Sequence, residues 1–401
     1  GCSRLESVEL PTGLTFIGKE TFGRCSLLSQ IEIGPALESI DSSAFAYCVG
    51  LSSFDIHPEN PYYGSQEGSL CNKEQTQLFI CPAGKVGTFT LPPNIVDFLP
   101  NAFQGCIHLT DFEVHPEHTL YTSRDGVLYN HAGDTLLVFP AGRTGQCTIA
   151  EGTTTLASLS FSDSSLLSLI LPASLAKIEE RAFWYCSALL GIGFEGDAPE
   201  TGTDIFYDVP STLAVYYKSG ANGWGDEFAG YPARSDAQNQ TITLTPVSQT
   251  LTYGDADQQL WASSSSALVV TLLTSPEEIA TVTSSKMLRI KAAGTFTITG
   301  YQPGGTRRNV NYFPAEPASM TLEVLPKAAT VKVDSLELPS NYPLPFFSFS
   351  VEGLVKDDTL EGPALYYIDG IPIDELLTPL PEGTYELSAD GLFHPNYTFS
   401  Y

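Results

Sequence analysis

Residues 28–48 read LSQIEIGPALESIDSSAFAYC, and this stretch decides the fold. A short apolar segment is followed by a proline, two spaced aliphatic residues, an aromatic residue and a cysteine, namely Leu28, Ile31, Ile33, Pro35, Leu37, Ile40, Phe45 and Cys48. The same order begins 23 positions earlier at Leu5 and ends at Phe22 and Cys25. Because leucine-rich repeats have periods of about 20–29 residues and bury their apolar edges only by stacking, the stretch predicts a solenoid.

A second period of 58 residues is superimposed on the first. It relates Phe45 to Phe103, and Phe103 to Phe161. A piece is inserted between these units, at residues 68–84 in one copy and 126–142 in the next. Each copy has two short apolar runs around a polar turn, which predicts two short β-strands.

These motifs resemble the BspA-type leucine-rich repeats of bacterial surface proteins, also called the Treponema pallidum type. The family pattern L..I.LP..L..I...AF..C is present from Leu28 to Cys48, and its DGVLYN…PAG variant from Asp125 to Gly142. The resemblance covers roughly the first half of the chain. It implies a cell-surface or secreted adhesion module rather than an enzyme.

The repeat pattern ends near residue 235, so we expect a solenoid with a C-terminal cap over 1–235 and a short polar linker at Ser235–Gln240. Short alternating segments between Gly, Ser and Pro turns then predict a β-sandwich over 236–326, similar to bacterial immunoglobulin-like (Ig-like) domains. Residues 327–401 resemble the small β modules called MBG, which accompany mucin-binding repeats. The fold class is mainly β: a leucine-rich-repeat solenoid with short helical turns, plus two C-terminal β domains.

The 401 residues carry a formal net charge of −27, with an isoelectric point near 4.4. This acidity excludes nucleic acid and anionic membranes as partners, because phosphate binding needs clustered Lys and Arg side chains. No apolar run approaches the roughly 18 residues of a membrane span, so we expect no membrane insertion of this fragment. The sequence opens within a repeat at Gly1 and Cys2. We therefore expect that a signal or anchor segment has been lost. We also expect the protein to be extracellular or on the cell surface, and to be a monomer.

Five of the eight cysteines share one position of the repeat, which favours buried thiols over disulfides. They are Cys2, Cys25, Cys48, Cys106 and Cys186. Equivalent thiols would stack along the solenoid as a ladder of compact apolar groups. Cys71, Cys81 and Cys147 take positions that aromatic residues fill in the other copy. A Cys71–Cys81 disulfide is the alternative.

No sequence motif for catalysis or phosphate binding is present, so we expect no enzyme and no cofactor. His115 and His118 form the densest histidine cluster, and a polar turn explains them better than a metal site or a base. Two acidic pairs could supply oxygen ligands to Ca²⁺, but neither has EF-hand spacing and solvated turns are favoured; the pairs are Asp255 with Asp257, and Asp357 with Asp358.

One surface pattern suggests a binding site. Side chains alternate along a strand, so the residue just before the last apolar position of each repeat strand points away from the core. That position is acidic in four units, and inserted units add threonines: Glu9, Glu32, Asp55 and Glu113, with Thr90 and Thr148. This acidic stripe either keeps an exposed sheet soluble and deters edge pairing, or binds a basic or Ca²⁺-bridged partner.

These observations predict a non-enzymatic bacterial adhesion protein whose solenoid binds a protein or glycoprotein, such as a host matrix protein or a mucin. Two alternatives remain. A glycan- or mucin-binding accessory protein would show exposed aromatic side chains beside a carboxylate pair in a cleft. A structural surface-layer component would associate with itself and bind no foreign ligand.

Overall fold

The structure is a computed structural model, and its described residues form β-strands joined by turns. It describes residues 2–235, 237–245, 250–337, 344, 347–355, 358–360, 365–375 and 380–401. Two compact units are present. The first comprises Gly1–Thr241, Ser264–Leu268 and Tyr301–Glu316, and the second comprises Ile242–Ser263, Val269–Gly300 and Pro317–Tyr401. The domain boundaries at 235 and 326 stay predictions.

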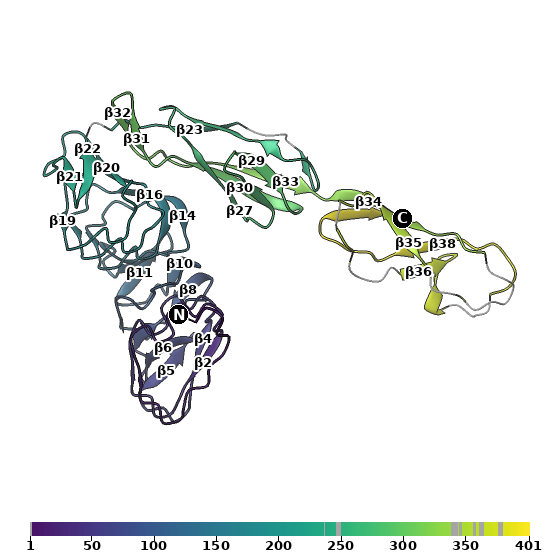
Figure 1. The fold of residues 1–401 in the computed structure, drawn as a ribbon, viewed down its shortest axis with the longest axis horizontal. Helices are drawn as coiled ribbons and strands as arrows, with labels where there is room; N and C mark the ends of the chain where they lie inside the picture. Colours follow the sequence, from purple (N-terminus) through teal and green to yellow (C-terminus); the bar gives the residue numbers. More distant parts are fainter. Residues whose placement is uncertain are drawn as a thin grey trace. The chain divides into compact units, whose positions relative to one another are not determined.

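Each coil of the first unit after the first contributes one strand to a parallel sheet along one side of the solenoid (Figure 1). The sheet consists of three separate runs of strands. The first is β2 (Gln30–Ile33) with β4 (Ser53–Ile56), and the second is β8 (Gly87–Leu91) with β10 (Leu109–Val114). The third contains β14 (Thr144–Thr148), β16 (Ser165–Leu171), β18 (Gly191–Phe194), β20 (Ala214–Tyr217) and β22 (Tyr231–Arg234), with β21 (Glu227–Phe228) antiparallel to β22.

Short strands also line a second side of the coils. They pair in parallel as β1 (Phe16–Ile17) with β3 (Ser39–Ile40), and as β15 (Thr155–Leu156), β17 (Lys177–Ile178) and β19 (Glu200–Thr201). No helix occurs among the described residues of the solenoid, where short helical turns were expected. Positive φ angles, such as 54° at Arg181 and 56° at Tyr185, end each turn before a helix can form.

Both inserted pieces contain the two predicted strands. In the first piece β6 (Ser69–Asn72) pairs with β7 (Gln77–Ile80), and in the second β12 (Val127–Asn130) pairs with β13 (Thr135–Val138). A preceding strand extends each pair to a three-stranded meander, β5 (Tyr63–Gln66) in one copy and β11 (Tyr121–Arg124) in the other. Each meander continues the short-strand side, where β7 pairs with β9 (Asp97–Phe98) and β13 with β15.

A column of phenylalanine rings shows that each inserted piece is itself a coil. Phe139, from the second piece, stacks on Phe161 at 4.8 Å between ring centroids. Phe161 stacks on Phe183 at 5.1 Å, and Phe183 packs against Phe206 at 5.3 Å. Cys81 takes the place of Phe139 in the first piece, 58 residues earlier. The 58-residue period is therefore two coils, and each ring pair adds about 0.5–1.5 kcal/mol beyond its burial.

The cysteine ladder connects successive coils through hydrogen bonds. The thiol of Cys48 donates to the carbonyl of Phe22 at 3.0 Å, and that of Cys186 to the carbonyl of Phe161 at 3.0 Å. All eight cysteines are free, and burial raises the pKa of the Cys48 thiol to about 11. Cys2 departs from the predicted ladder because it is exposed in the first coil, where no described coil covers it.

The second unit begins as a β-sandwich with its own core. One sheet has the order β24 (Leu251–Thr252), β33 (Ala318–Leu325), β30 (Gly294–Tyr301) and β27 (Thr271–Ser275). The other has β25 (Gln258–Gln259), β29 (Met287–Ile290) and β28 (Ala280–Val282). A third pair joins β23 (Ile242–Thr245) to β26 (Trp261–Ser264). Phe296 and Ile298 lie in the core between them.

The C-terminal residues form two small three-stranded sheets. The first sheet contains β34 (Lys327–Val333), β35 (Phe349–Glu352) and β39 (Tyr397–Ser400). The second contains β36 (Leu365–Ile368), β37 (Ile371–Pro372) and β38 (Leu387–Asp390), with the 3-10 helix η1 at Ile373–Glu375. Val331, Ala389 and Leu392 form the buried cluster, which is much smaller than the solenoid core.

Candidate functional site: the outward face of the solenoid sheet

The outward face of the parallel sheet is polar where the strands alternate. In β2 the side chains of Ile31 and Ile33 are buried, whereas Glu32 is exposed. In β4 Asp55 is exposed, and it lies directly opposite Glu32 in the parallel pairing. Because neighbouring strands are about 4.7–4.9 Å apart, these two carboxylates are neighbours on the face.

The other two predicted site residues lie apart from this pair. Glu113 is exposed on β10 and pairs with Thr90 of β8, in the second run of the sheet. Glu9 is exposed but lies outside the strands. The structure therefore brings together Glu32 and Asp55, and places Glu113 and Glu9 separately.

Two basic residues occupy the interruptions of the sheet. Between β10 and β14, Arg143 donates through Nε to the carbonyl of Thr110 at 2.7 Å and through Nη2 to Asp111 Oδ1 at 2.8 Å. Between β4 and β8, Lys85 Nζ donates to the carbonyl of Glu67. Sequence reasoning missed this pair, although Lys85 and Arg143 are 58 residues apart and so belong to the long period. Arg143 Nη2 also donates to the carbonyl of Asp125 at 2.6 Å, so each basic side chain binds the hairpin turn of an inserted piece and adds a positive charge beside the sheet.

Part of the third run is covered by a hairpin within the same compact unit. This hairpin consists of β31 (Gly305–Arg307) and β32 (Val310–Tyr312). A Cβ atom on Gly193 of β18 would lie 2.8 Å from the ring of Phe313, so only glycine fits there. Tyr216, which pairs with Gly193, is 1% exposed. Along the solenoid, the outward-facing position of the strands therefore changes from an exposed acidic residue to a residue that the hairpin segment covers.

Polar contacts join the segment that covers the sheet, around the hairpin β31–β32, to Gln240, which lies just before the second unit. Gln240 is buried, and its Nε2 donates to the carbonyl of Phe313 at 2.6 Å. The same amide group contacts the side chains of Gln302 and Ser266. Residue 236 of the expected linker lies outside the described residues. Separation of the two halves at Ser235–Gln240 stays a prediction.

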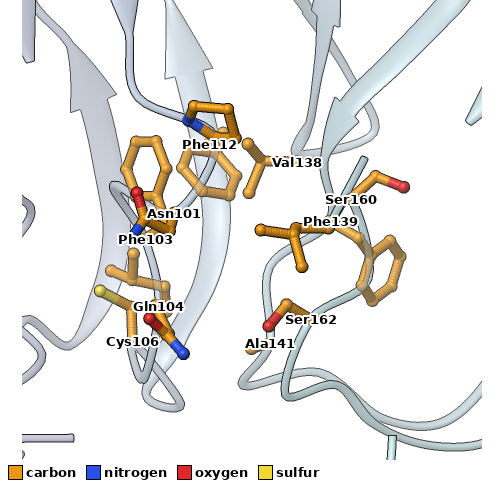
Figure 2. Close-up of a pocket in the computed structure, with 13 residues that line it drawn as sticks. Asn101, Phe103, Gln104, Cys106, Phe112, Val138, Phe139, Ala141, Ser160 and Ser162 are labelled. Carbon is orange, nitrogen blue, oxygen red and sulfur yellow. The ribbon is translucent and has the colours of Figure 1, made fainter. Parts of the chain in front are cut away.

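A cavity beside Cys106 is too small to be a ligand site. Its volume is about 30 Å³, and Figure 2 shows Phe103 and Phe112 facing Val138 and Phe139 across it. A volume near 30 Å³ corresponds to about one water molecule. The cavity marks the junction between an ordinary coil and an inserted coil.

The histidine cluster stabilises a turn. His118 is buried, and its Nδ1 accepts from the amide of Leu120 at 3.2 Å. Its Nε2 therefore carries the proton and donates to the carbonyl of Ile95 at 3.1 Å. His115 Nδ1 similarly accepts from the amide of Glu117 at 3.2 Å. Both rings thus bind backbone groups: His115 within its own turn, and His118 both in its turn and at Ile95, 23 residues earlier.

The acidic pairs considered for Ca²⁺ bind other groups of the same chain, at the positions that the structure describes. Asp255 Oδ2 accepts from the amide of Thr252 at 2.8 Å, and Asp257 forms an ion pair with Arg289 at 3.1 Å. Asp358 accepts from the hydroxyl of Tyr253 at 2.9 Å, whereas Asp357 lies outside the described residues. Within the described ranges, no group of three or more His, Cys, Asp or Glu side chains could hold a metal ion. The described part of the chain also has no helix long and apolar enough to span a membrane.

Comparison with protein families identifies the repeats. The family described as "BspA type Leucine rich repeat region" matches in six copies over residues 1–119 and 143–227, which is about half of the chain. No curated protein matches the chain.

Three solved structures of bacterial proteins are similar to part of the chain. The pneumococcal vaccine antigen PcpA is 20% identical, with a TM-score of 0.33 over 51% of this chain and 54% of that one. A leucine-rich repeat protein of Eubacterium ventriosum is 18% identical, with a TM-score of 0.37 over 53% and 59%. A leucine rich cell surface protein of Faecalibacterium prausnitzii is 19% identical, with a TM-score of 0.33 over 55% and 62%. The chain thus spans less than two thirds of each of these relatives.

Proposed function

The chain belongs to the family with the BspA-type leucine-rich repeat region, and from this premise we propose that it is a non-enzymatic interaction protein of a bacterial cell surface. A protein-interaction role is what the repeat family supports. Its partner would be a protein or glycoprotein, such as a host matrix protein or a mucin. The Ig-like sandwich and the MBG-like module would act as stalk domains that hold the solenoid away from its anchor.

One observation carries this proposal: the outward face of the sheet is open over its first strands and sealed over later ones. Glu32, Asp55 and Glu113 are exposed at the same strand position at which Gly193 and Tyr216 are covered. A face that needed only solubility has no reason to differ so sharply along its length. Stacked repeats bind along the surface that stacking makes continuous.

The charge of the open face indicates the chemistry of the partner. Glu32 and Asp55 have no basic side chain within ion-pair distance in the described structure, whereas Asp111 is paired with Arg143. Unpaired carboxylates on rigid strands favour a basic patch on the partner. Such complementarity mainly raises the association rate and makes it depend on salt.

The test is binding of the full chain to immobilised matrix proteins, mucins and polysaccharides at two salt concentrations. The test variant replaces four carboxylates together: Glu9→Gln, Glu32→Gln, Asp55→Asn and Glu113→Gln. These side chains are exposed, so the core is untouched and folding should survive. We expect slower association with a basic protein partner and a weaker dependence on salt.

The matched control changes four exposed carboxylates of the second unit: Glu277→Gln, Glu278→Gln, Glu323→Gln and Glu337→Gln. It removes the same number of charges, so general electrostatic attraction affects both variants equally. Loss of salt-dependent association in the test variant alone supports the proposal. Equal effects in both variants, or none in either, would contradict it. Self-association without any foreign ligand would favour a structural surface-layer role instead.

A further inference from the structure

Among the residues that the structure describes, the last complete turn of the solenoid has three amide groups without acceptors. In the preceding coil the amides of Arg181, Phe183 and Tyr185 donate to the carbonyls of Thr203, Ile205 and Tyr207, at 3.1, 2.9 and 3.0 Å. Their equivalents one coil later are the amides of Asp204, Phe206 and Asp208. In the described part of the chain, no further coil supplies carbonyls to them.

A carbonyl group is left over at the same end. Leu156 O accepts from the amide of Glu179 at 2.9 Å, and Ile178 O accepts from the amide of Gly202 at 2.7 Å. One coil later the equivalent carbonyl is that of Thr201, which has no donor among the described residues. β19 is accordingly the last strand of its sheet. Donors and an acceptor thus lie together at the end of the ladder.

These groups border a polar hollow within the first unit. Its volume is about 380 Å³, and its lining includes Thr201, Asp204, Tyr207, Asp208 and Ala229. Ala229 lies in the turn between the antiparallel strands β21 and β22, and among the described residues this turn makes no backbone hydrogen bond to residues 201–208. The hollow therefore occupies the space of a missing turn. Its size is within the range of about 300–1,000 Å³ found for small-ligand sites.

An aromatic ring forms one wall of the hollow. Tyr207 stacks on Trp184 at 4.5 Å with an interplanar angle of 21°, and Arg181 lies over the Trp184 ring at 4.7 Å. The Trp184 ring therefore contacts both Tyr207 and Arg181. Tyr207 is 48% exposed and lines the hollow, whereas Trp184 does not. The Tyr207 ring also makes an edge-to-face contact with Tyr185 at 6.0 Å, so two aromatic neighbours fix its orientation at the edge of the hollow.

The hollow is bordered by both carboxylates and amide donors, and this combination favours a neutral ligand. An anion would meet the exposed carboxylates of Asp204 and Asp208, and a cation would meet the three free amides. A neutral group that both donates and accepts satisfies both sets. Hydroxyl groups do this, because each has one donor and two acceptor positions. The ring of Tyr207 adds an apolar surface beside them.

We propose that this hollow binds a neutral hexopyranose unit of a glycan. The apolar C–H face of the sugar packs on Tyr207. Its hydroxyls donate to the carboxylates and to the Thr201 carbonyl, and accept from the amides of Asp204, Phe206 and Asp208. The site is separate from the acidic sheet face and does not depend on binding there. It has the exposed aromatic ring beside two carboxylates that a glycan-binding role requires.

The test is titration of the full chain with neutral trisaccharides of glucose, galactose, mannose and N-acetylglucosamine, followed by calorimetry. Tyr207→Ala should weaken the best of these at least tenfold, because the stacking surface is lost. Tyr207→Phe should keep most of the affinity, since the ring remains. Asp204→Asn with Asp208→Asn should also weaken binding, because amide groups replace part of the acceptors.

The matched control is Tyr62→Ala, since Tyr62 is 47% exposed in the solenoid but does not line the hollow. It should leave affinity unchanged, and thermal unfolding of each variant checks that the fold is intact. No binding of any trisaccharide to the unaltered chain would overturn the proposal. Equal affinity of the Tyr207→Ala and Tyr62→Ala variants for the trisaccharide would also overturn it. So would displacement of the bound trisaccharide by a basic or acidic peptide but not by free sugar.

Discussion

Tyr47, Gly105 and Asp163 are each 58 residues apart and contact one another on one edge of the solenoid. The Tyr47 hydroxyl donates to Asp163 Oδ1 at 2.8 Å, and the amide of Gly105 donates to Asp163 Oδ2 at 3.0 Å. A Cβ atom on Gly105 would lie 2.7 Å from the Tyr47 amide nitrogen, at a φ of +79°. Glycine therefore lets the tyrosine of one long repeat reach the aspartate two repeats later.

Burial has an electrostatic consequence at Asp163. Desolvation raises the pKa of this carboxyl, while its hydrogen bonds from Tyr47, Gly105 and Ser162 partly oppose the shift. A raised pKa in the folded state means that the folded chain holds the proton more tightly than the unfolded chain. The stability from this group is fully present below the unfolded pKa of about 3.9, and is lost as the pH rises through the folded pKa.

We therefore predict that Asp163→Asn changes the pH dependence of stability. The free energy of unfolding of the unaltered chain, minus that of the variant, should fall as the pH rises from about 4 to 7. Urea unfolding at several pH values measures this. Asp41→Asn is the control: hydrogen bonds from Ser43 lower the pKa of Asp41, so the corresponding difference should stay nearly level from pH 4 to 7 and fall only below about pH 4. The same slope for both variants would refute the assignment.

At the scale of elements, the hairpin β31–β32 and the segment around it act as a cover for the third run of the sheet. Phe313 is 4% exposed and contacts Gly193, and Pro303 contacts Gly191. Both glycines occupy β18. The absence of their side chains lets the covering segment approach the strand closely.

Phe313→Ala should destabilise the first unit by about 3–5 kcal/mol, the usual cost of truncating a buried phenylalanine. Amide exchange in β18 and β20 should increase, because their cover is loosened. Phe313→Leu should cost less, since much of the side chain remains. Phe393→Ala is the control, because Phe393 is 76% exposed. A small effect of Phe313→Ala, comparable to that of Phe393→Ala, would show that the cover does not stabilise the sheet.

The repeat fold could be predicted because its signals are local and periodic: Phe45, Phe103 and Phe161 mark the coils directly. The coil nature of the inserted pieces was missed, because Phe139 was compared only with Cys81 of the other copy and not with Phe161, on which its ring stacks. The covered part of the face could not be predicted from the repeats alone. It depends on contacts between β18 and residues more than 100 positions later, which no local pattern encodes.

At the scale of the whole molecule, acidic residues outnumber basic ones more than twofold. The chain has 46 acidic and 19 basic residues, so most of its surface repels other acidic molecules. Such a surplus of negative charge keeps a protein soluble, and it raises the association rate of basic partners over that of acidic ones. At physiological salt the Debye length is about 8 Å, so only carboxylates close to the contact influence binding strongly.

The central claim is that partners bind the open acidic part of the sheet face, and hydrogen–deuterium exchange of the full chain tests it most directly. Exchange would be compared with and without a basic protein partner identified by the binding panel. We predict slower exchange in β2, β4, β8 and β10 on binding, with no change in β18 and β20, whose face is already covered. Protection confined to the second unit, or to β1 and β3 on the second side of the coils, would contradict the claim.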